Sequence, residues 1–128
     1  MPGPLLVLLV DDDANVAALT ERHLGARGME MRWTATALGA CNMARRVRPD
    51  IVLLDVEMPA LTGDALVQLL RRSTAPGVRI VLYSSHDDAT LRAIARRTGA
   101  DGWISKSAGG DVLAQYLTRV VRLGGHEA

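Results

Sequence analysis

The stretch Leu5-Leu6-Val7-Leu8-Leu9-Val10-Asp11-Asp12-Asp13 joins six consecutive apolar residues to three consecutive carboxylates. An apolar run without alternation predicts a strand that is buried on both faces. Strands of this kind belong to parallel sheets that are covered by helices on both sides. The stretch therefore predicts a strand of an α/β fold, with acidic side chains where the chain leaves the sheet.

The remainder of the chain alternates strand-like runs with helical segments. Four more strands are expected at residues 29–34, 51–54, 79–83 and 102–105. We expect five helices: one that follows the aspartates and ends at Gly28, one that includes residues 38–47 and stops before Pro49, two at residues 64–72 and 87–98, and a last one that includes residues 112–120. Their inward faces are expected to include Val16, Leu19, Leu24, Leu66, Leu69, Leu70, Leu91, Ile94, Ala95, Val112, Leu113, Tyr116, Leu117 and Val120. The alternation predicts a doubly wound parallel sheet with right-handed crossovers.

Length, composition and charge exclude several classes of protein. With 128 residues, 48% of them hydrophobic, the chain fits one globular domain. Its net charge of +1 provides no field that would attract nucleic acid, so we expect no direct nucleic-acid binding by this chain. Cys41 is the only cysteine, the N-terminus lacks a signal-peptide pattern, and no apolar run approaches the roughly 20 residues that span a bilayer. We therefore expect a cytoplasmic protein that does not enter the membrane.

Carboxylate, hydroxyl and ammonium side chains follow four of the five expected strands. They are Asp11, Asp12 and Asp13 after the first strand, Asp55 after the third, Ser84 after the fourth, and Lys106, the only lysine of the chain, after the fifth. In an open parallel sheet the carboxyl ends of the strands gather at one edge, so these side chains are expected to meet.

The expected cluster suits a magnesium ion and a phosphoryl group. Crowded carboxylates repel one another, which raises their pKa values unless a cation intervenes. Mg²⁺ prefers hard oxygen ligands and commonly combines one or two carboxylates with waters and phosphate oxygens. Asp55 would then be a nucleophile that forms an acyl phosphate, and Lys106 would neutralise charge on the phosphoryl oxygens. Ser84 would donate a hydrogen bond to one of these oxygens.

Each of these residues also has an ordinary structural explanation. Asp13 fits the N-cap of the first helix, and Asp55 fits a residue between a strand and a turn. Ser84 fits a turn, and Lys106 fits a solvated surface lysine. The placement of all of them at strand ends favours a shared site.

Together these motifs resemble the receiver domain of bacterial two-component response regulators, over essentially the whole chain. The motifs are Val10-Asp11-Asp12-Asp13, Asp55-Val56-Glu57-Met58-Pro59 with Gly63, Ser84-Ser85, and Gly102-Trp103-Ile104-Ser105-Lys106. The resemblance implies a flavodoxin-like sheet with strand order 2-1-3-4-5. It also implies a phosphoacceptor that assists its own phosphorylation and dephosphorylation but is not otherwise an enzyme.

The resemblance implies a role for each site residue. Asp55 would accept a phosphoryl group from a sensor histidine kinase or a phosphotransfer protein. Asp12 and Asp55 would bind Mg²⁺ directly, Asp11 would bind it through a water, and the backbone carbonyl of Glu57 would be a further ligand. Ser84 and Lys106 would contact the phosphoryl group.

The resemblance also implies a switch. Phosphorylation would draw Ser84 inward and turn Trp103 toward the core, which would remodel the surface of the fourth helix, fifth strand and fifth helix. Glu57 and His86 would flank the attacking water and tune the lifetime of the phosphoryl group.

Two residues depart from the family pattern. Ser107 stands where proline is common, so residues 107–110 are expected to be more mobile. Trp103 stands where Tyr or Phe is usual, and its larger ring is expected to restrict the inward rotamer.

The sequence leaves three functions open. The first is a phosphoacceptor signalling domain at residues 1–123, followed by a tail or excised linker at 124–128, with a homodimer through the fourth and fifth helices as one mode of output. The second is a magnesium-dependent phosphohydrolase with an aspartyl nucleophile. The third is a degenerate receiver that serves only as an interaction module.

Overall fold

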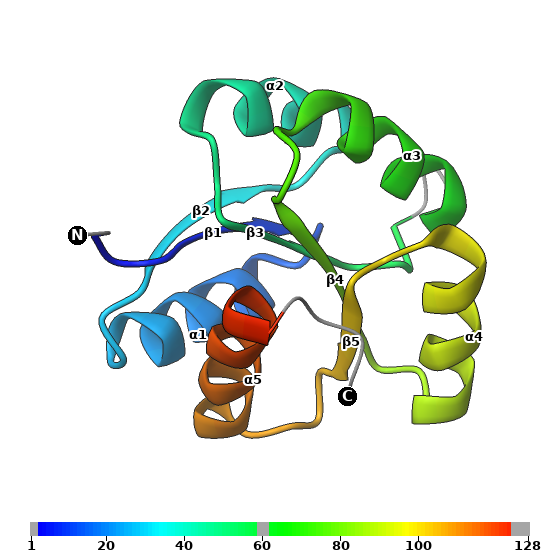
Figure 1. Ribbon diagram of the computed structural model, residues 1–128. Helices are drawn as coiled ribbons and strands as arrows, with labels where there is room; N and C mark the ends of the chain where they lie inside the picture. The colour runs from blue at the N-terminus through cyan, green and yellow to red at the C-terminus, as the bar shows by residue number, and fades with distance from the viewer. Residues whose placement is uncertain (1–2, 59–61, 124–128) are drawn as a thin grey trace.

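The computed structural model describes residues 3–58 and 62–123, which form one parallel sheet with helices on both faces (Figure 1). The strands are β1 (Leu6–Val10), β2 (Glu30–Thr34), β3 (Ile51–Leu54), β4 (Arg79–Ser84) and β5 (Gly102–Ser105). The helices are α1 (Ala14–Gly25), α2 (Ala37–Val47), α3 (Gly63–Ser73), α4 (Asp88–Thr98) and α5 (Gly110–Leu123). The strand order β2-β1-β3-β4-β5 confirms the predicted doubly wound α/β fold.

The strand order places a switch point between β1 and β3. The chain leaves β1 toward β2 on one side and later returns to β3 on the other side. Val10 pairs with Leu54, and Leu54 pairs with Leu82, so these three strands end at nearly the same level. In such sheets ligands bind outside the carboxyl ends of the strands, at the point where the order reverses.

Alternate residues of the central strands β1, β3 and β4 enter two separate hydrophobic cores. Leu8 and Val10 pack on the face that is covered by α2, α3 and α4, whereas Val7 and Leu9 pack on the face that is covered by α1 and α5 (Figure 1). All four side chains are fully buried. Burial on both faces explains why the strand is continuously apolar.

Side-chain caps fix where the helices begin. The Asp13 carboxylate accepts hydrogen bonds from the backbone N–H groups of Asn15, at 2.8 Å, and Val16, at 3.4 Å. This confirms the N-cap explanation of Asp13. Helix α4 is capped by Asp87 at its start and by Gly99 at its end, and Gly99 adopts a left-handed φ of 78°.

The first helix ends earlier than predicted. It stops at Gly25, and Gly28 lies beyond it in the turn that leads to β2. The backbone N–H of Met29 donates to the carbonyl of Leu24, so the turn folds back on the last helical residues. The left-handed φ of 77° at Gly28 serves this turn and not the end of the helix.

Three apolar residues that were predicted to face inward are exposed. Leu19 is 45% exposed, Leu69 is 37% exposed and Val112 is 54% exposed, so these predictions are wrong. Leu19 and Val112 are not among the buried residues with which α1 and α5 pack on the sheet. Leu69 lines an open groove between α2 and α3, together with the exposed side chain of Leu38.

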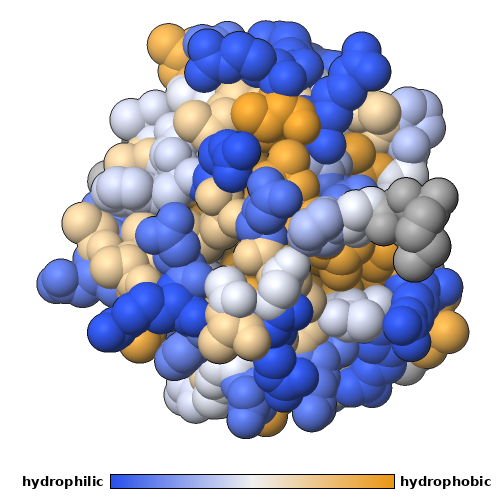
Figure 2. Space-filling view, turned by 90° about the vertical axis from the view of Figure 1, so that its left-hand side faces the viewer, coloured by the Kyte–Doolittle hydropathy of each residue, from blue (hydrophilic) through white to orange (hydrophobic). Residues whose placement is uncertain are grey.

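The edge strand β2 is much less buried than the central strands. Glu30, Arg32 and Trp33 are exposed, because β2 pairs only with β1. On this side of the molecule apolar side chains form broken patches among hydrophilic ones (Figure 2). Charged residues on an exposed edge strand discourage pairing with another chain.

Two parts of the predictions lie outside the described residues: Pro59 of the motif after β3 and the tail at 124–128. Among the helices that the described residues form, none has the length and apolar character that crossing a bilayer requires.

Truncation of a buried leucine should cost far more stability than truncation of an exposed one. Leu53 is fully buried in β3, whereas Leu38 is 74% exposed on α2. We expect Leu53→Ala to lower the free energy of unfolding by about 2–5 kcal/mol, because it removes apolar contacts and leaves a cavity. The matched variant Leu38→Ala should change it by less than about 0.5 kcal/mol. Urea denaturation measures both, and equal effects would contradict the described packing.

Candidate functional site

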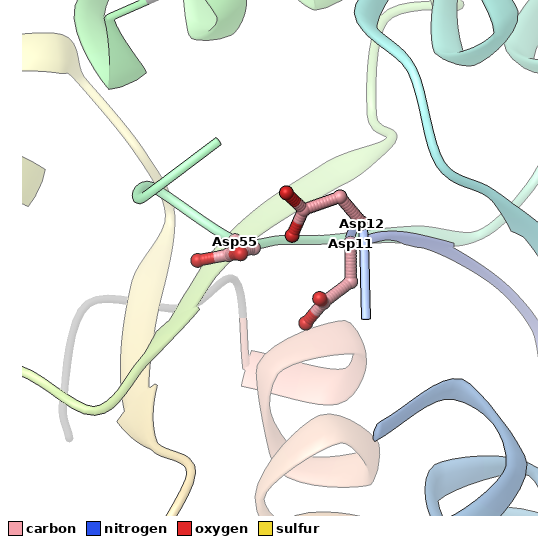
Figure 3. Close-up of side chains that lie close together, drawn as sticks. All are labelled: Asp11, Asp12 and Asp55. Atoms are coloured by element: carbon pink, nitrogen blue, oxygen red, sulfur yellow. The ribbon is translucent and has the colours of Figure 1, made fainter. Parts of the chain in front are cut away.

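Three carboxylates meet at the carboxyl edge of the sheet. Asp11 and Asp12 follow β1 and Asp55 follows β3, and one carboxylate oxygen of each lies within 4.8 Å of the others. Figure 3 shows the three side chains gathered at the ends of these two strands. Asp11 is fully buried and Asp55 is 4% exposed, whereas Asp12 is exposed to solvent. The predicted acidic cluster therefore forms, and Asp13 is not part of it.

Among the described residues, Lys106 forms the ion pairs with this cluster. Its Nζ lies 2.8 Å from Oδ2 of Asp11 and 3.6 Å from Oδ2 of Asp55. Burial by itself lowers the pKa of Lys106, but the contacts with Asp11 and Asp55 outweigh it and raise the pKa above its ordinary value. The side chain therefore remains an ammonium ion at neutral pH, and the surface explanation of Lys106 is wrong.

Burial raises the pKa of Asp55 above its ordinary value. The backbone N–H of Glu57, which donates to Oδ1 at 2.9 Å, and the charge of Lys106 act in the opposite direction. The negative charges of Asp11 and Glu57 raise the pKa further. Ionised Asp55 is thus held at a free-energy cost, which a cation at the cluster would remove.

The cluster fits a hard divalent cation. Oδ2 of Asp11 is buried and, among the described residues, accepts no hydrogen bond of good geometry, although it forms the ion pair with Lys106. Three carboxylates face one ammonium group, so negative charge is in excess. Carboxylate oxygens are the ligands that Mg²⁺ prefers. The coordination by the Glu57 carbonyl stays a prediction.

The predicted hydroxyl donor, Ser84, forms a hydrogen bond with Glu57. Ser84, the last residue of β4, is fully buried, and its hydroxyl donates to Oε2 of Glu57 at 2.8 Å. The Ser85 hydroxyl donates to the same oxygen at 3.1 Å, and Nε2 of His86 lies 3.8 Å from Oε1. The bond from Ser84 is the main cause that lowers the pKa of Glu57.

The backbone joins the hydroxyl to the lysine. The N–H of Lys106 donates to the carbonyl of Ser84 at 2.8 Å, which continues the pairing of β4 with β5 beyond the last strand residues. Ser84 and Lys106 are therefore held side by side.

Both tryptophans make contacts that sequence reasoning missed. The indole N–H of Trp33 donates to the backbone carbonyl of Asp11 at 2.7 Å, across from β2 to the end of β1. The indole N–H of Trp103 donates to Oδ1 of Asp88 in α4, also at 2.7 Å. Neither contact has a signal in the sequence, because the partners are 22 and 15 residues apart.

The sheet order and the charged groups at its edge are those that the resemblance to two-component receiver domains implies. The model of one family, described as the response regulator receiver domain, matches residues 7–118. The chain belongs to this family of receiver domains.

Curated relatives are longer proteins. The transcriptional regulatory protein PrrA of Mycobacterium tuberculosis is 34% identical over 117 residues, which are 91% of this chain and 48% of PrrA. The transcriptional regulatory protein AfsQ1 of Streptomyces coelicolor is 30% identical over 125 residues, which are 98% of this chain and 54% of AfsQ1. The chain thus spans about half the length of these relatives.

Solved structures agree with the fold. The chemotaxis response regulator CheY4 of Vibrio cholerae superposes with a TM-score of 0.82 at 27% identity and covers 91% of this chain and 98% of its own. A LuxR-family response regulator from Aurantimonas gives a TM-score of 0.83 at 25% identity, with 94% and 86% covered. These likenesses support the receiver fold over more than nine-tenths of the chain.

Replacement of Asp55 by asparagine should stabilise the metal-free domain. Because folding raises the pKa of Asp55, ionised Asp55 destabilises the folded state, and asparagine removes this charge. We expect the melting temperature at neutral pH, with a chelator present, to rise by about 4 °C, the shift that about 1 kcal/mol causes in a domain of this size. This rise in melting temperature should be full at neutral pH and should shrink as the pH falls through the raised pKa of Asp55. It should vanish below the ordinary pKa of an aspartate.

Calorimetry over a pH series measures this difference. Asp12→Asn is the matched control, because Asp12 is exposed and should give a smaller gain. A gain for Asp55→Asn that does not change with pH would contradict the assigned cause.

Proposed function

We propose that Asp55 is the residue that accepts a phosphoryl group, with a sensor histidine kinase or a histidine phosphotransfer protein as donor. The observation that carries this proposal is the buried Asp55 carboxylate beside Lys106 and the Asp11–Asp12 pair. Membership of the receiver family supports it. A carboxylate oxygen attacks the phosphorus atom, the bond from phosphorus to the donor nitrogen breaks, and the donor imidazole keeps the electron pair of that bond.

Different side chains around Asp55 would bind the metal ion and the phosphoryl oxygens during this transfer. Asp12 and Asp55 would bind Mg²⁺ directly, Asp11 would act through a water, and the carbonyl of Glu57 would complete the protein ligands. The ion would neutralise charge on the phosphoryl oxygens. Lys106 would hold a second oxygen, because its ammonium already lies between Asp11 and Asp55.

Ser84 would bind a phosphoryl oxygen only after it leaves Glu57. Its hydroxyl proton is donated to Glu57 in the described state, so the same proton cannot serve the phosphoryl group. Release of this bond would accompany the switch in which Ser84 moves inward and Trp103 turns toward the core. The surface of α4, β5 and α5 would then signal to a partner, to an output domain or to a second copy of the chain.

The wider protein context is also a proposal. The relatives are named transcriptional regulatory proteins and are about twice as long. We infer that residues 1–123 are the receiver unit and that a longer regulator carries its output in another domain. A cytoplasmic location suits a partner of a sensor kinase, and the net charge of +1 argues against DNA binding by this chain itself.

The two rival functions have less support. The family is one of signalling domains, which favours a phosphoacceptor over a phosphohydrolase. A degenerate receiver would lack some of the acceptor, acidic, hydroxyl or lysine groups, whereas all of these are present and adjacent here. We therefore propose an active receiver that assists its own phosphorylation and dephosphorylation.

Incubation with acetyl phosphate and Mg²⁺ tests the acceptor. We expect one phosphoryl adduct on the wild-type chain and none on Asp55→Asn, because the amide is not a nucleophile toward phosphorus. Intact-mass spectrometry counts the adducts, and Asp12→Asn separates loss of the metal from loss of the acceptor. An adduct on Asp55→Asn, or none on the wild type at saturating Mg²⁺, would refute the assignment.

Glu57→Ala should lengthen the lifetime of the phosphoryl group. The change frees the Ser84 hydroxyl, which then donates to the phosphoryl group without competition. We expect the decay to slow about fivefold, the effect of about 1 kcal/mol, which is typical of one hydrogen bond. The decay of the phosphorylated mass after removal of the phosphodonor measures this.

Ser84→Ala in the Glu57→Ala background is the control for this lifetime. If Glu57 acts through Ser84, the longer lifetime should be lost when the hydroxyl is absent. A lifetime that stays long in the double variant would show that Glu57 acts on the attacking water instead.

A further inference from the structure

The Trp103 indole bridges β5 and α4. Its N–H donates to Oδ1 of Asp88 at 2.7 Å, while Oδ2 of the same carboxylate accepts a hydrogen bond from Arg92 at 2.9 Å. The ring is partly buried against the hydrophobic core that also contains Leu91 of α4. Asp88 therefore fixes the indole at the N-terminal end of α4.

The bridge connects the two strand ends that carry the site. Asp88 stands four residues after Ser84, and Trp103 stands three residues before Lys106. The backbone bond from Lys106 to Ser84 joins these strand ends directly. Residues 84–88, the Trp103 indole, β5 and this backbone bond form a closed ring of covalent and hydrogen bonds. The ring restricts how far Ser84 and Trp103 can move relative to each other while the bridge is intact.

We propose that Asp88 is a positioning residue that holds Trp103 against α4 and so sets the equilibrium between the resting and the phosphorylated conformations. This inference rests on the proposed function, in which Trp103 turns toward the core. The turn separates the indole N–H from Asp88, so the hydrogen bond stabilises the resting conformation alone. An interaction that one of two states makes biases the population toward that state.

The bridge depends on the particular aromatic residue of this chain. A phenylalanine ring has no donor, so Trp103→Phe keeps an aromatic side chain and removes the bond. Asp88→Ala removes the acceptor. If the two side chains act through one bond, the two changes should not add in the double variant.

Asp88 also has a purely structural role that must be separated from this one. It provides negative charge in the first turn of α4 and pairs with Arg92. Arg92→Gln removes that ion pair and leaves the indole bond. Asp88→Asn removes the charge and retains a side-chain oxygen that can accept from the indole.

The test measures activation and the resting state separately. Calorimetry gives the half-saturating concentration of beryllofluoride, a phosphoryl mimic, in excess Mg²⁺. We expect about a fivefold decrease for Asp88→Ala, for Trp103→Phe and for their double variant, and less than a twofold change for Asp88→Asn and Arg92→Gln. Hydrogen exchange of the Trp103 indole N–H without phosphoryl mimic should be accelerated in Asp88→Ala and unchanged in Arg92→Gln.

The possible results separate failure of the positioning role from failure of the proposed function. Three results would overturn the positioning role. Asp88→Ala could bind beryllofluoride no more tightly than the wild type, or the effects of Asp88→Ala and Trp103→Phe could add in full. Equal effects of Asp88→Ala and Arg92→Gln would overturn it as well. A wild-type chain that binds no beryllofluoride but protects its indole N–H would refute the proposed function, and the regulatory role of Asp88 with it. Failure of the inference alone appears as normal wild-type binding without the expected ranking of variants.

Discussion

Repulsion among the carboxylates that the sheet brings together at its switch point is the constraint behind the electrostatics of the site. Asp11 and Asp55 are buried at the ends of neighbouring strands, with Asp12 beside them and the single ammonium of Lys106 between them. One positive charge cannot balance three negative ones, so the site stores unfavourable electrostatic energy. A divalent cation bound at the cluster would relieve this repulsion, so we expect occupancy of the site and stability of the fold to be linked.

The architecture and the main site residues could be predicted from the sequence for one reason. Strands that are buried on both faces are continuously apolar, so their ends are visible in the sequence, and a parallel sheet gathers those ends at one edge. Asp11, Asp55 and Lys106 were found in this way. The N-cap at Asp13 was also visible, because it stands directly before a helical pattern.

Helix faces and side-chain contacts were less predictable. Leu19, Leu69 and Val112 have the apolar character of core residues, yet packing of each helix on the sheet leaves them exposed. The bonds of Glu57 with Ser84, and of Trp33 with Asp11, join residues from different loops and strands. Such contacts depend on rotamers and on the separation of elements, which a pattern of residue types does not encode.

Lys106 gives the domain an unusual chemical property. The described surface carries its other positive charges on arginines, and the whole sequence contains a single lysine. Any reagent or modifying enzyme that is selective for lysine side chains therefore has one side-chain target in this chain, and that target is the ammonium paired with Asp11. Acylation there would remove the positive charge that pairs with Asp11 and Asp55, so one covalent change would alter the electrostatics of the cluster and leave the arginines of the surface unchanged.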